Sequence, residues 1–333
     1  MITLIPVFIR MPPLTSIPPD VLRYRHRLSV QQINSLFGRE VIEETLGEKA
    51  GALVKVAEFI RVTDLLRAAS IDFIPLKGPL LSFRLYGDAT TRRYGDIDIL
   101  VDPLEVEKAR VGLLAAGYNE YMVTWPESAM GKKKALRFWH HVSFQNPESE
   151  VVTELHWKLS NRQWLNFRNA DRFVRENLCN VEFCGNKYQV LNPEAELLYL
   201  VIHGGIHRWG MLKWLVDIQR YLEISGFDNG KFCGLVKWFD CGRMVTLCNR
   251  MLEEYFPGTS LLPCGTQLPC YMERLAEETI EKPSSRGPGS ISEILHLLPY
   301  SFIVYPGVKY KVKILGMIAG SSLFNGRLSR LFD

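Results

Sequence analysis

The chain has 333 residues, of which 47% are hydrophobic and 23% are charged, and its formal net charge at pH 7 is +4. This composition is ordinary for a soluble globular protein, and the length allows about two or three structural units with a real core. The small positive charge suits an anionic ligand. It does not indicate nucleic acid as a partner, because any basic patch must be local.

The cysteines and the start of the chain predict a cytoplasmic protein. There are seven cysteines, an odd number, and no two have the Cys-x-x-Cys spacing. We therefore expect reduced cysteines, with no disulfide framework and no structural zinc site. The first nine residues are apolar but have no basic segment before them, which is not typical of a signal peptide. No run reaches the ~20 apolar residues that a membrane span needs.

The N-terminal part of the chain predicts an arm followed by helices. Residues 1–30 are rich in proline, which favours an extended arm. Apolar residues at helical spacing then predict helices over residues 30–37 and 40–70. The second helix leads directly into the stretch around which the rest of the chain is organised.

That stretch begins with a short apolar run at residues 73–76, which predicts a buried strand. Lys77 and Gly78 follow, and residues 79–86 predict an amphipathic helix with proline in its first turn. After a loop that carries Arg92, a second strand is expected over residues 96–101.

The second strand contains Asp96 and Asp98, which lie on one face because side chains alternate along a strand. Two carboxylates this close repel each other unless a positive charge lies between them. A hard divalent cation with oxygen ligands is the simplest such partner, and Mg²⁺ is the usual choice beside phosphates. The spacing is compatible with a magnesium site, but the motif alone is a weak signal because aspartates are common on strands.

A hairpin is expected to add to this site. Residues 104–116 predict a helix, and Lys132, Lys133 and Lys134 predict either a solvated loop or a mobile basic flap over phosphates. Residues 138–145 and 151–159 then predict two strands of a hairpin. If this hairpin lies beside the aspartate strand, Glu154 is the third carboxylate, with His156 on the same face and His141 near it.

The remainder predicts a second, mostly helical part. Another hairpin is expected over residues 181–191, and helices over 194–224, broken near Gly204-Gly205 or Gly210, and over 232–256. Residues 281–290 predict a linker or exposed loop. The basic and apolar tail over residues 304–333 favours a docked terminal helix over a membrane-surface segment.

The motifs together resemble a known family. A glycine turn after a strand, then a helix, then Asp-x-Asp on the next strand is similar to the nucleotidyltransferase fold of the DNA-polymerase-beta superfamily. Leu76-Lys77-Gly78 followed by Arg92-x-x-x-Asp96-Ile97-Asp98 resembles a branch of largely uncharacterised bacterial nucleotidyltransferases. That branch also carries Asp/Glu-x-His-Trp, here residues 154–157, and His-x3-His-x6-Trp-x2-Asp, matched here by His203, His207, Trp214 and Asp217.

The resemblance implies an α+β fold, in which a small mixed β-sheet flanked by helices precedes a mostly helical C-terminal domain. It covers roughly residues 50–225. We accordingly expect an N-terminal arm and helix over residues 1–50, a nucleotidyltransferase catalytic domain over 51–190, and a helical domain with a basic tail over 191–333.

The resemblance further implies Mg²⁺-dependent transfer of a nucleoside monophosphate from an NTP, ATP by default, to a hydroxyl-bearing acceptor with release of pyrophosphate. Two Mg²⁺ ions, or Mn²⁺, would be bridged by Asp96 and Asp98, and Glu154 would be the third ligand and a general base. The nucleotide would be bound by Lys77, Gly78, Arg92, His156, His203 and His207.

Several alternatives stay open. The same site could move a terminal phosphate onto a peptide or small molecule, and the chain could also be a non-catalytic binding or scaffold protein. His156 could simply be a hydrogen-bonded residue at a strand end. His203 and His207 lack the glutamate of the HExxH zinc motif, so docking of the helices is favoured over zinc there. The acceptor, whether small molecule, peptide, protein side chain or RNA end, and the preferred base are not fixed by the sequence.

Overall fold

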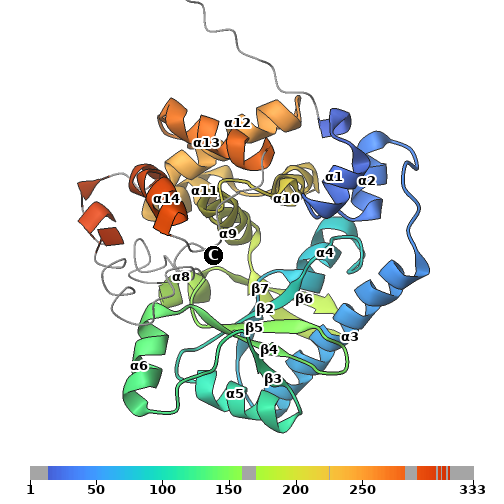
Figure 1. Cartoon of the computed structure of the whole chain (residues 1–333), viewed down its shortest axis with the longest axis vertical. Helices are drawn as coiled ribbons and strands as arrows, with labels where there is room; N and C mark the ends of the chain where they lie inside the picture. The colour runs from blue at the N-terminus through green and yellow to red at the C-terminus, as the bar shows by residue number, and fades with distance from the viewer. Residues whose placement is uncertain are drawn as a thin grey trace, which may run out of the picture.

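The computed structural model describes residues 14–159, 170–224, 226–281 and 291–304, together with 307–308, 310–312 and 314–315. Its lower half in Figure 1 holds a five-stranded sheet, and its upper half is a stack of helices. The strands of the large sheet are β1 (Phe73–Pro75), β2 (Asp96–Val101), β3 (Asn119–Tyr121), β4 (His141–Gln145) and β5 (Val152–His156). A separate hairpin consists of β6 (Leu178–Phe183) and β7 (Asn186–Leu191). This mixed sheet, flanked by helices, confirms the α+β fold.

The strand order in the large sheet is β1-β2-β5-β4-β3. β2 and β5 are parallel, and every other neighbouring pair is antiparallel. The expected hairpin of β4 and β5 is therefore confirmed, and it lies directly beside the aspartate strand. The smaller hairpin of β6 and β7 is confirmed as well.

One face of the sheet is apolar and packs on two helices, α3 (Leu46–Ala68) and α5 (Val106–Ala115). Ile97, Ile99 and Leu155 point to this side and are at most 1% exposed. They join one hydrophobic cluster with residues of both helices, among them Phe59 and Val62 of α3. Because this cluster lies behind the sheet, it fixes the strands while their other face stays available for polar side chains.

The helices of the upper half are α9 (Pro193–Ile206), α10 (Leu212–Ile224), α11 (Asn229–Trp238), α12 (Gly242–Tyr255), α13 (Cys270–Glu281) and α14 (Ile291–Val304). The expected helical break falls at residues 207–211, near Gly210 rather than at Gly204-Gly205. These helices share a second hydrophobic cluster that also includes Leu81 and Leu85 of α4 (Gly78–Tyr86). Helix α4 therefore connects the sheet to the helical half (Figure 1).

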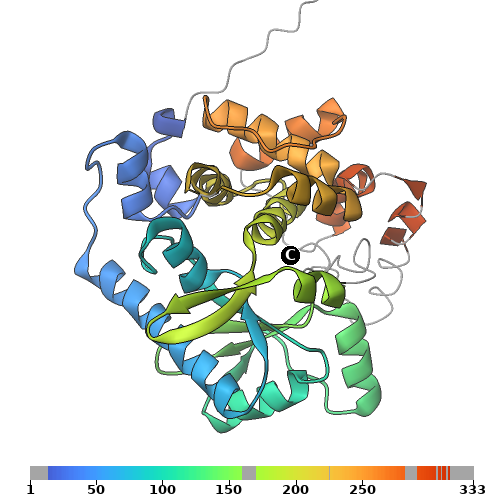
Figure 2. The same cartoon turned by 180° about the vertical axis from the view of Figure 1, so that it is seen from behind.

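Residues 14–30 differ from the extended arm that the prolines predict, whereas residues 1–13 of that arm lie outside the described residues. The segment from residue 14 contains a 3₁₀ turn (Leu14–Ser16), α1 (Pro19–Tyr24) and α2 (Val30–Phe37), with proline accommodated in the first turn of α1. These helices lie beside α10 in both views (Figures 1 and 2). Leu22 and Leu28 join the helical cluster, and Arg25 donates to the backbone carbonyls of Ile280 and Glu281.

Two further expectations about local structure are wrong. Lys132, Lys133 and Lys134 lie in a helix, α6 (Ala129–Phe138), rather than in a loop. Ser128 caps this helix by accepting a hydrogen bond from the Gly131 N–H, and this capping signal was available in the sequence. Helix α3 begins at Leu46, not at residue 40, because Thr45 and Glu48 form a capping box. A short helix, α8 (Ala170–Glu176), precedes β6.

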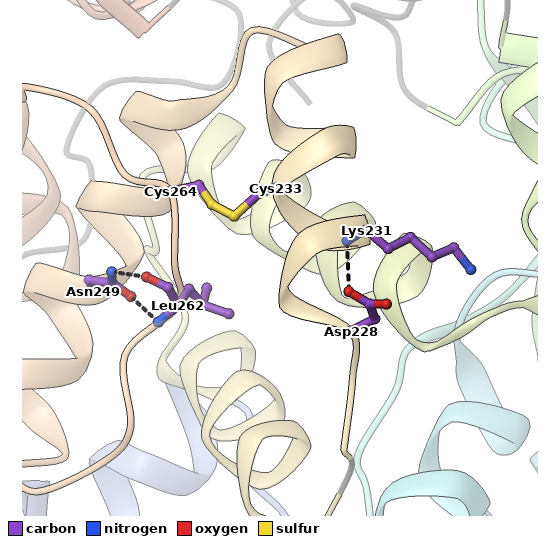
Figure 3. The surroundings of a disulfide bond; sticks show 6 residues. All are labelled: Asp228, Lys231, Cys233, Asn249, Leu262 and Cys264. Carbon is purple, nitrogen blue, oxygen red and sulfur yellow. Dashed lines mark hydrogen bonds between the residues drawn. A yellow bond between two sulfur atoms is a disulfide. The ribbon is translucent and has the colours of Figure 1, made fainter.

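The expectation that all cysteines are reduced is also wrong, because Cys233 of α11 and Cys264 form a disulfide bond (Figure 3). Their Cα atoms lie 5.6 Å apart although the residues are 31 positions apart in sequence, a proximity that no spacing rule could reveal. Cys264 lies in the segment between α12 and α13. Asn249 of α12 binds the same segment through two hydrogen bonds to the backbone of Leu262 (Figure 3).

Some predictions cannot be compared with the fold. The expected linker lies almost wholly outside the described residues, as does most of the basic tail. Among the helices formed by the described residues, none is both long and apolar enough to cross a bilayer.

Candidate active site

The polar face of the sheet brings the three predicted carboxylates to neighbouring strands. The parallel register of β2 and β5 pairs Asp98 with Glu154, and Asp96 lies two residues before Asp98 on the same face. Asp98 is 4% exposed, so its carboxylate is largely removed from water. The strand alternation that the sequence predicts is thus realised, and the pairing of β2 with β5 completes the cluster.

His156 lies between two of these carboxylates. Its Nε2 is 3.1 Å from Asp98 Oδ1 and 3.1 Å from Glu154 Oε2. Burial by itself lowers the pKa of His156, but the two hydrogen bonds outweigh it and raise the pKa to about 9. His141, on the adjacent strand, reaches the other side of Glu154, with 3.6 Å between Nε2 and Oε1. Both histidines that the sequence placed near Glu154 are therefore beside it.

Lys77 supplies the second cation of the site. Leu76 donates its N–H to the carbonyl of Asp98, which brings the next residue, Lys77, beside the Asp98 side chain. The distance from Lys77 Nζ to Asp98 Oδ2 is 3.4 Å. Burial opposes ionisation of both groups, yet their attraction keeps the pKa of Lys77 above and that of Asp98 well below the ordinary values.

Gly78 opens α4 directly after this lysine. Its φ is +67°, a left-handed conformation that glycine adopts without steric cost and other residues rarely adopt. The chain can therefore turn sharply from Lys77 into a helix whose first turn carries free N–H groups. Such a helix start is a suitable place for a phosphate group.

Asp96 differs from the other two carboxylates, since it makes no hydrogen bond or ion pair with another described residue. Burial raises its pKa, and repulsion from Asp98 and Glu154 raises it further. Asp98, Glu154 and His156 each offer a ligand atom within 4.8 Å of one another, while Asp96 falls outside that group. The donor set, three carboxylates with one left uncompensated, fits a hard cation such as Mg²⁺.

Arg92, expected to contact the triphosphate, is paired elsewhere. Its Nε lies 2.9 Å from each carboxylate oxygen of Asp217 in α10, and its side chain is 3% exposed. Burial acts against the charges of this pair, and their mutual attraction raises the pKa of Arg92. The arginine thus fastens the helical half to the loop before β2.

His203 of α9 and His207, which directly follows that helix, lie in an aromatic cluster with Trp214 of α10. The ring centroids of the two histidines are 4.7 Å apart, and each lies 5.2 Å from the centroid of Trp214. Burial, then the nearby charge of Lys77, lowers the pKa of His203 well below its ordinary value. His203 therefore borders the site as an uncharged ring, within an aromatic cluster that it shares with His207 and Trp214.

Lys213 is a residue of the site that the motifs did not reveal. It is 8% exposed and forms no hydrogen bond or ion pair with another described residue. Burial, then the charge of Arg92, lowers its pKa to about 7, although Asp217 and Asp96 act in the opposite direction. Its position, one helical turn before Asp217 and next to Trp214, was the only sequence signal that could have drawn attention to it.

The chain is similar to a known protein family. The sequence model of a family described as "uncharacterised nucleotidyltransferase" matches residues 37–257. No curated protein matches the chain. The crystal structure of an antigenic nucleotidyltransferase-like protein from Paracoccidioides brasiliensis is similar over 55% of this chain and 87% of that chain, with 16% identity and a TM-score of 0.35.

Proposed function

The chain belongs to the family of uncharacterised nucleotidyltransferases, and from this premise we propose that it transfers a nucleoside monophosphate from an NTP to a hydroxyl-bearing acceptor and releases pyrophosphate. The reaction would depend on Mg²⁺, or on Mn²⁺ in its place, with ATP as the default donor. The expected location in the cytoplasm, where this donor is abundant, stays a prediction.

The observation that carries this proposal is the pairing of β2 with β5. It sets Asp98 opposite Glu154, with Asp96 on the same face and the start of α4 at its border. A scaffold protein would gain nothing from keeping three repelling carboxylates together, since their proximity opposes folding. Such an arrangement is expected where a cation is bound during function.

Each residue of the site has a role in this proposal. Asp96, Asp98 and Glu154 would hold the metal ions, which when bound neutralise charge on the attacking and leaving oxygens. Glu154 would also accept the proton of the acceptor hydroxyl, and His156 would orient that carboxylate through the hydrogen bond to Oε2. Lys77 and the first-turn N–H groups of α4, which belong to Gly78, Leu80 and Leu81 because Pro79 has none, would bind the phosphates of the donor.

The helical half would complete the nucleotide site. His203 of α9 and His207, which directly follows that helix, would contact the nucleotide, because their rings can stack on a base. Arg92 would act through Asp217, by holding α10 in place, and would touch phosphate only if that ion pair opened. In this proposal the residues at the sheet bind the phosphates of the NTP, and the helical half binds its nucleoside.

Calorimetric titration of the four NTPs in the presence of Mg²⁺ tests the proposal. We expect one NTP to bind the wild type, and binding to be lost in the Asp96→Ala/Asp98→Ala variant and in wild type without metal. Asp102→Ala is the matched control, because Asp102 follows the same strand but only accepts a hydrogen bond from the Leu104 N–H. Absence of binding by a folded wild type would overturn the proposal and favour a scaffold.

The mass of the product separates nucleotidyl transfer from the alternative phosphotransferase. Nucleotidyl transfer adds a whole nucleoside monophosphate to the acceptor and releases pyrophosphate, whereas phosphoryl transfer adds one phosphate and releases a nucleoside diphosphate. The released species can be assayed before the acceptor is known, since water can stand in for it. Release of a nucleoside diphosphate would move the assignment to the phosphotransferase.

A further inference from the structure

Three histidine rings converge next to the carboxylate cluster, on the side of Glu154 away from Lys77. His141 of β4 is the register partner of His156 in β5, and His140 directly precedes β4. The ring centroids are 4.2 Å apart for His140 and His141, 5.0 Å for His141 and His156, and 5.6 Å for His140 and His156. One ring nitrogen from each residue lies within 4.8 Å of the other two.

The rings of His140 and His141 are arranged as two ligands of one ion would be. His141 Nδ1 and His140 Nε2 are 2.9 Å apart and share a hydrogen bond, which a bound ion would replace. Zinc–nitrogen bonds of about 2.0–2.1 Å place two ligands of a tetrahedral ion roughly 3.3–3.4 Å apart, so these rings need to separate by only about half an ångström. The backbone supports the arrangement, because the carbonyl of His140 accepts the N–H of Trp157 at 3.0 Å.

His156 contributes one ring nitrogen to the same group. Its Nδ1 is buried in a residue that is only 5% exposed, and it has no hydrogen-bond partner among the described residues. A buried polar atom without a partner is costly unless something binds it. The other nitrogen of the ring, Nε2, contacts Asp98 and Glu154. A histidine with one nitrogen on a carboxylate and the other on an ion has the form of a metal ligand with its supporting carboxylate. An ion bound here would displace the proton that the His156 ring holds at neutral pH.

We propose that His140, His141 and His156 form a second metal site, which takes a divalent transition ion of the zinc class. Imidazole nitrogens suit zinc, copper and nickel, whereas Mg²⁺ prefers the oxygens of the neighbouring carboxylates. Three protein ligands leave a fourth position open, as in sites that bind water or a substrate group. The proposal does not depend on nucleotidyl transfer, since it concerns only the binding of an ion.

The surroundings of the three rings are compatible with a bound cation. Asp98 and Glu154 provide negative charge on one side. The charge of Lys158 acts on His140, but its Nζ is held by the carbonyls of Arg137 and Trp139, to which it donates at 2.8 Å each. The side chain of His141 is 26% exposed, so an ion has access from solvent.

Titration of metal-free full-length protein with Zn²⁺ against a chromophoric chelator tests the proposal. We expect one tight equivalent in the wild type, and Co²⁺ in its place should give the visible absorption of a tetrahedral nitrogen-ligated ion. His140→Ala and His141→Gln should each weaken Zn²⁺ binding by more than about 100-fold, since loss of a mere supporting group already costs 10–100-fold. His141→Gln keeps the test usable if His140→Ala fails to fold, because His141 is partly exposed.

The His203→Gln/His207→Gln variant is the matched control, as it removes another histidine pair near the site and should leave Zn²⁺ binding unchanged. A wild type without a stoichiometric zinc equivalent would overturn the proposal. So would zinc binding that survives in the His140 and His141 variants but disappears in Asp98→Asn, since the ion would then lie among the carboxylates. Mg²⁺–NTP titration of the same samples reports separately on the proposed function.

Discussion

The two faces of the central sheet are made from alternate residues of the same strands, yet they differ in every physical respect. Ile99 and Leu155 point to the face under α3 and α5 and are fully buried among hydrocarbon. Asp98, Glu154 and His156 point to the other face and contact one another through charge. In β2 and β5, the odd-numbered residues therefore stabilise the fold, and the even-numbered residues form the candidate site. A single substitution should therefore change one property and spare the other.

The largest effect is expected on the charged face. Asp96→Asn should lower pyrophosphate release by about 10³-fold or more, because it removes a carboxylate that would bridge the metal ions. The same change should leave thermal stability unchanged or higher, because Asp96 has no partner and is repelled by Asp98 and Glu154. Steady-state kinetics and thermal melting of one preparation measure both. A variant that loses stability but keeps its rate would break the separation of the two faces.

The reverse result is expected on the apolar face. Leu155→Ala should lower the free energy of unfolding by about 2–5 kcal/mol, because the Leu155 side chain is fully buried and its truncation leaves a cavity behind the sheet. The dissociation constant of Mg²⁺–NTP for the folded protein should stay within about twofold. Urea unfolding and calorimetry give the two numbers. Leu104→Ala, at an 88% exposed leucine, is the control and should change stability by less than about 0.5 kcal/mol.

Lys213 sharpens the comparison, because it is a charge without a partner in an otherwise buried setting. Lys213→Met should weaken Mg²⁺–NTP binding by about 10- to 100-fold, as loss of a charge-assisted phosphate contact does. Stability should stay equal or rise, since an apolar side chain replaces a desolvated amine. Lys133→Met, at an exposed lysine of α6, should leave binding unchanged. Unaltered binding in Lys213→Met would show that this lysine has no role toward the donor.

The smallest effect is a pH dependence of stability that comes from His26, outside the sheet, and it must be separated from effects of the two sheet faces. Burial, then the charge of Arg25, lowers the pKa of His26 to about 4, and its Nδ1 accepts the N–H of Leu212 at 3.4 Å. Because the unfolded chain binds the proton more readily, this histidine's contribution is complete above pH 6.5 and is lost as the pH falls toward 4. At pH 5.5 the loss is about 1 kcal/mol. Unfolding curves of His26→Gln should show a correspondingly weaker pH dependence than the wild type.

The sequence predicted the parts of the site that depend on local pattern. Strand alternation placed Asp96 and Asp98 on one face of their strand, and Glu154 and His156 on one face of theirs. The Lys77-Gly78 turn predicted the start of a helix. What the sequence could not predict is which strands become neighbours, because Asp98 and Glu154, 56 positions apart in the sequence, meet through a parallel pairing. The same limit applies to the three histidines beside Glu154, because the direction in which each ring nitrogen points depends on packing and not on sequence spacing.

The roles of residues that depend on partners far away in the sequence were even harder to predict. Arg92 has the local setting of a phosphate ligand, but Asp217, 125 positions later, neutralises it in the folded protein. Lys213 is unusual only because other elements bury it, and burial of one lysine leaves no mark in a sequence. Cys233 and Cys264 were part of an odd count that pointed away from pairing, although two of the seven do pair. Long-range contacts decided each of these cases.

The contact of α1 with the end of α13 has a consequence for how the protein is made. Arg25 binds carbonyls 255 and 256 positions later, and Leu22 and Leu28 are buried in the same helical cluster. A ribosome that adds about 5–20 residues per second needs roughly 13–50 s to deliver those partners. For that interval Leu22 and Leu28 lack the later helices that bury them in the folded protein. The nascent chain therefore offers a holding chaperone its earliest binding site near α1, before the five-stranded sheet has been synthesised.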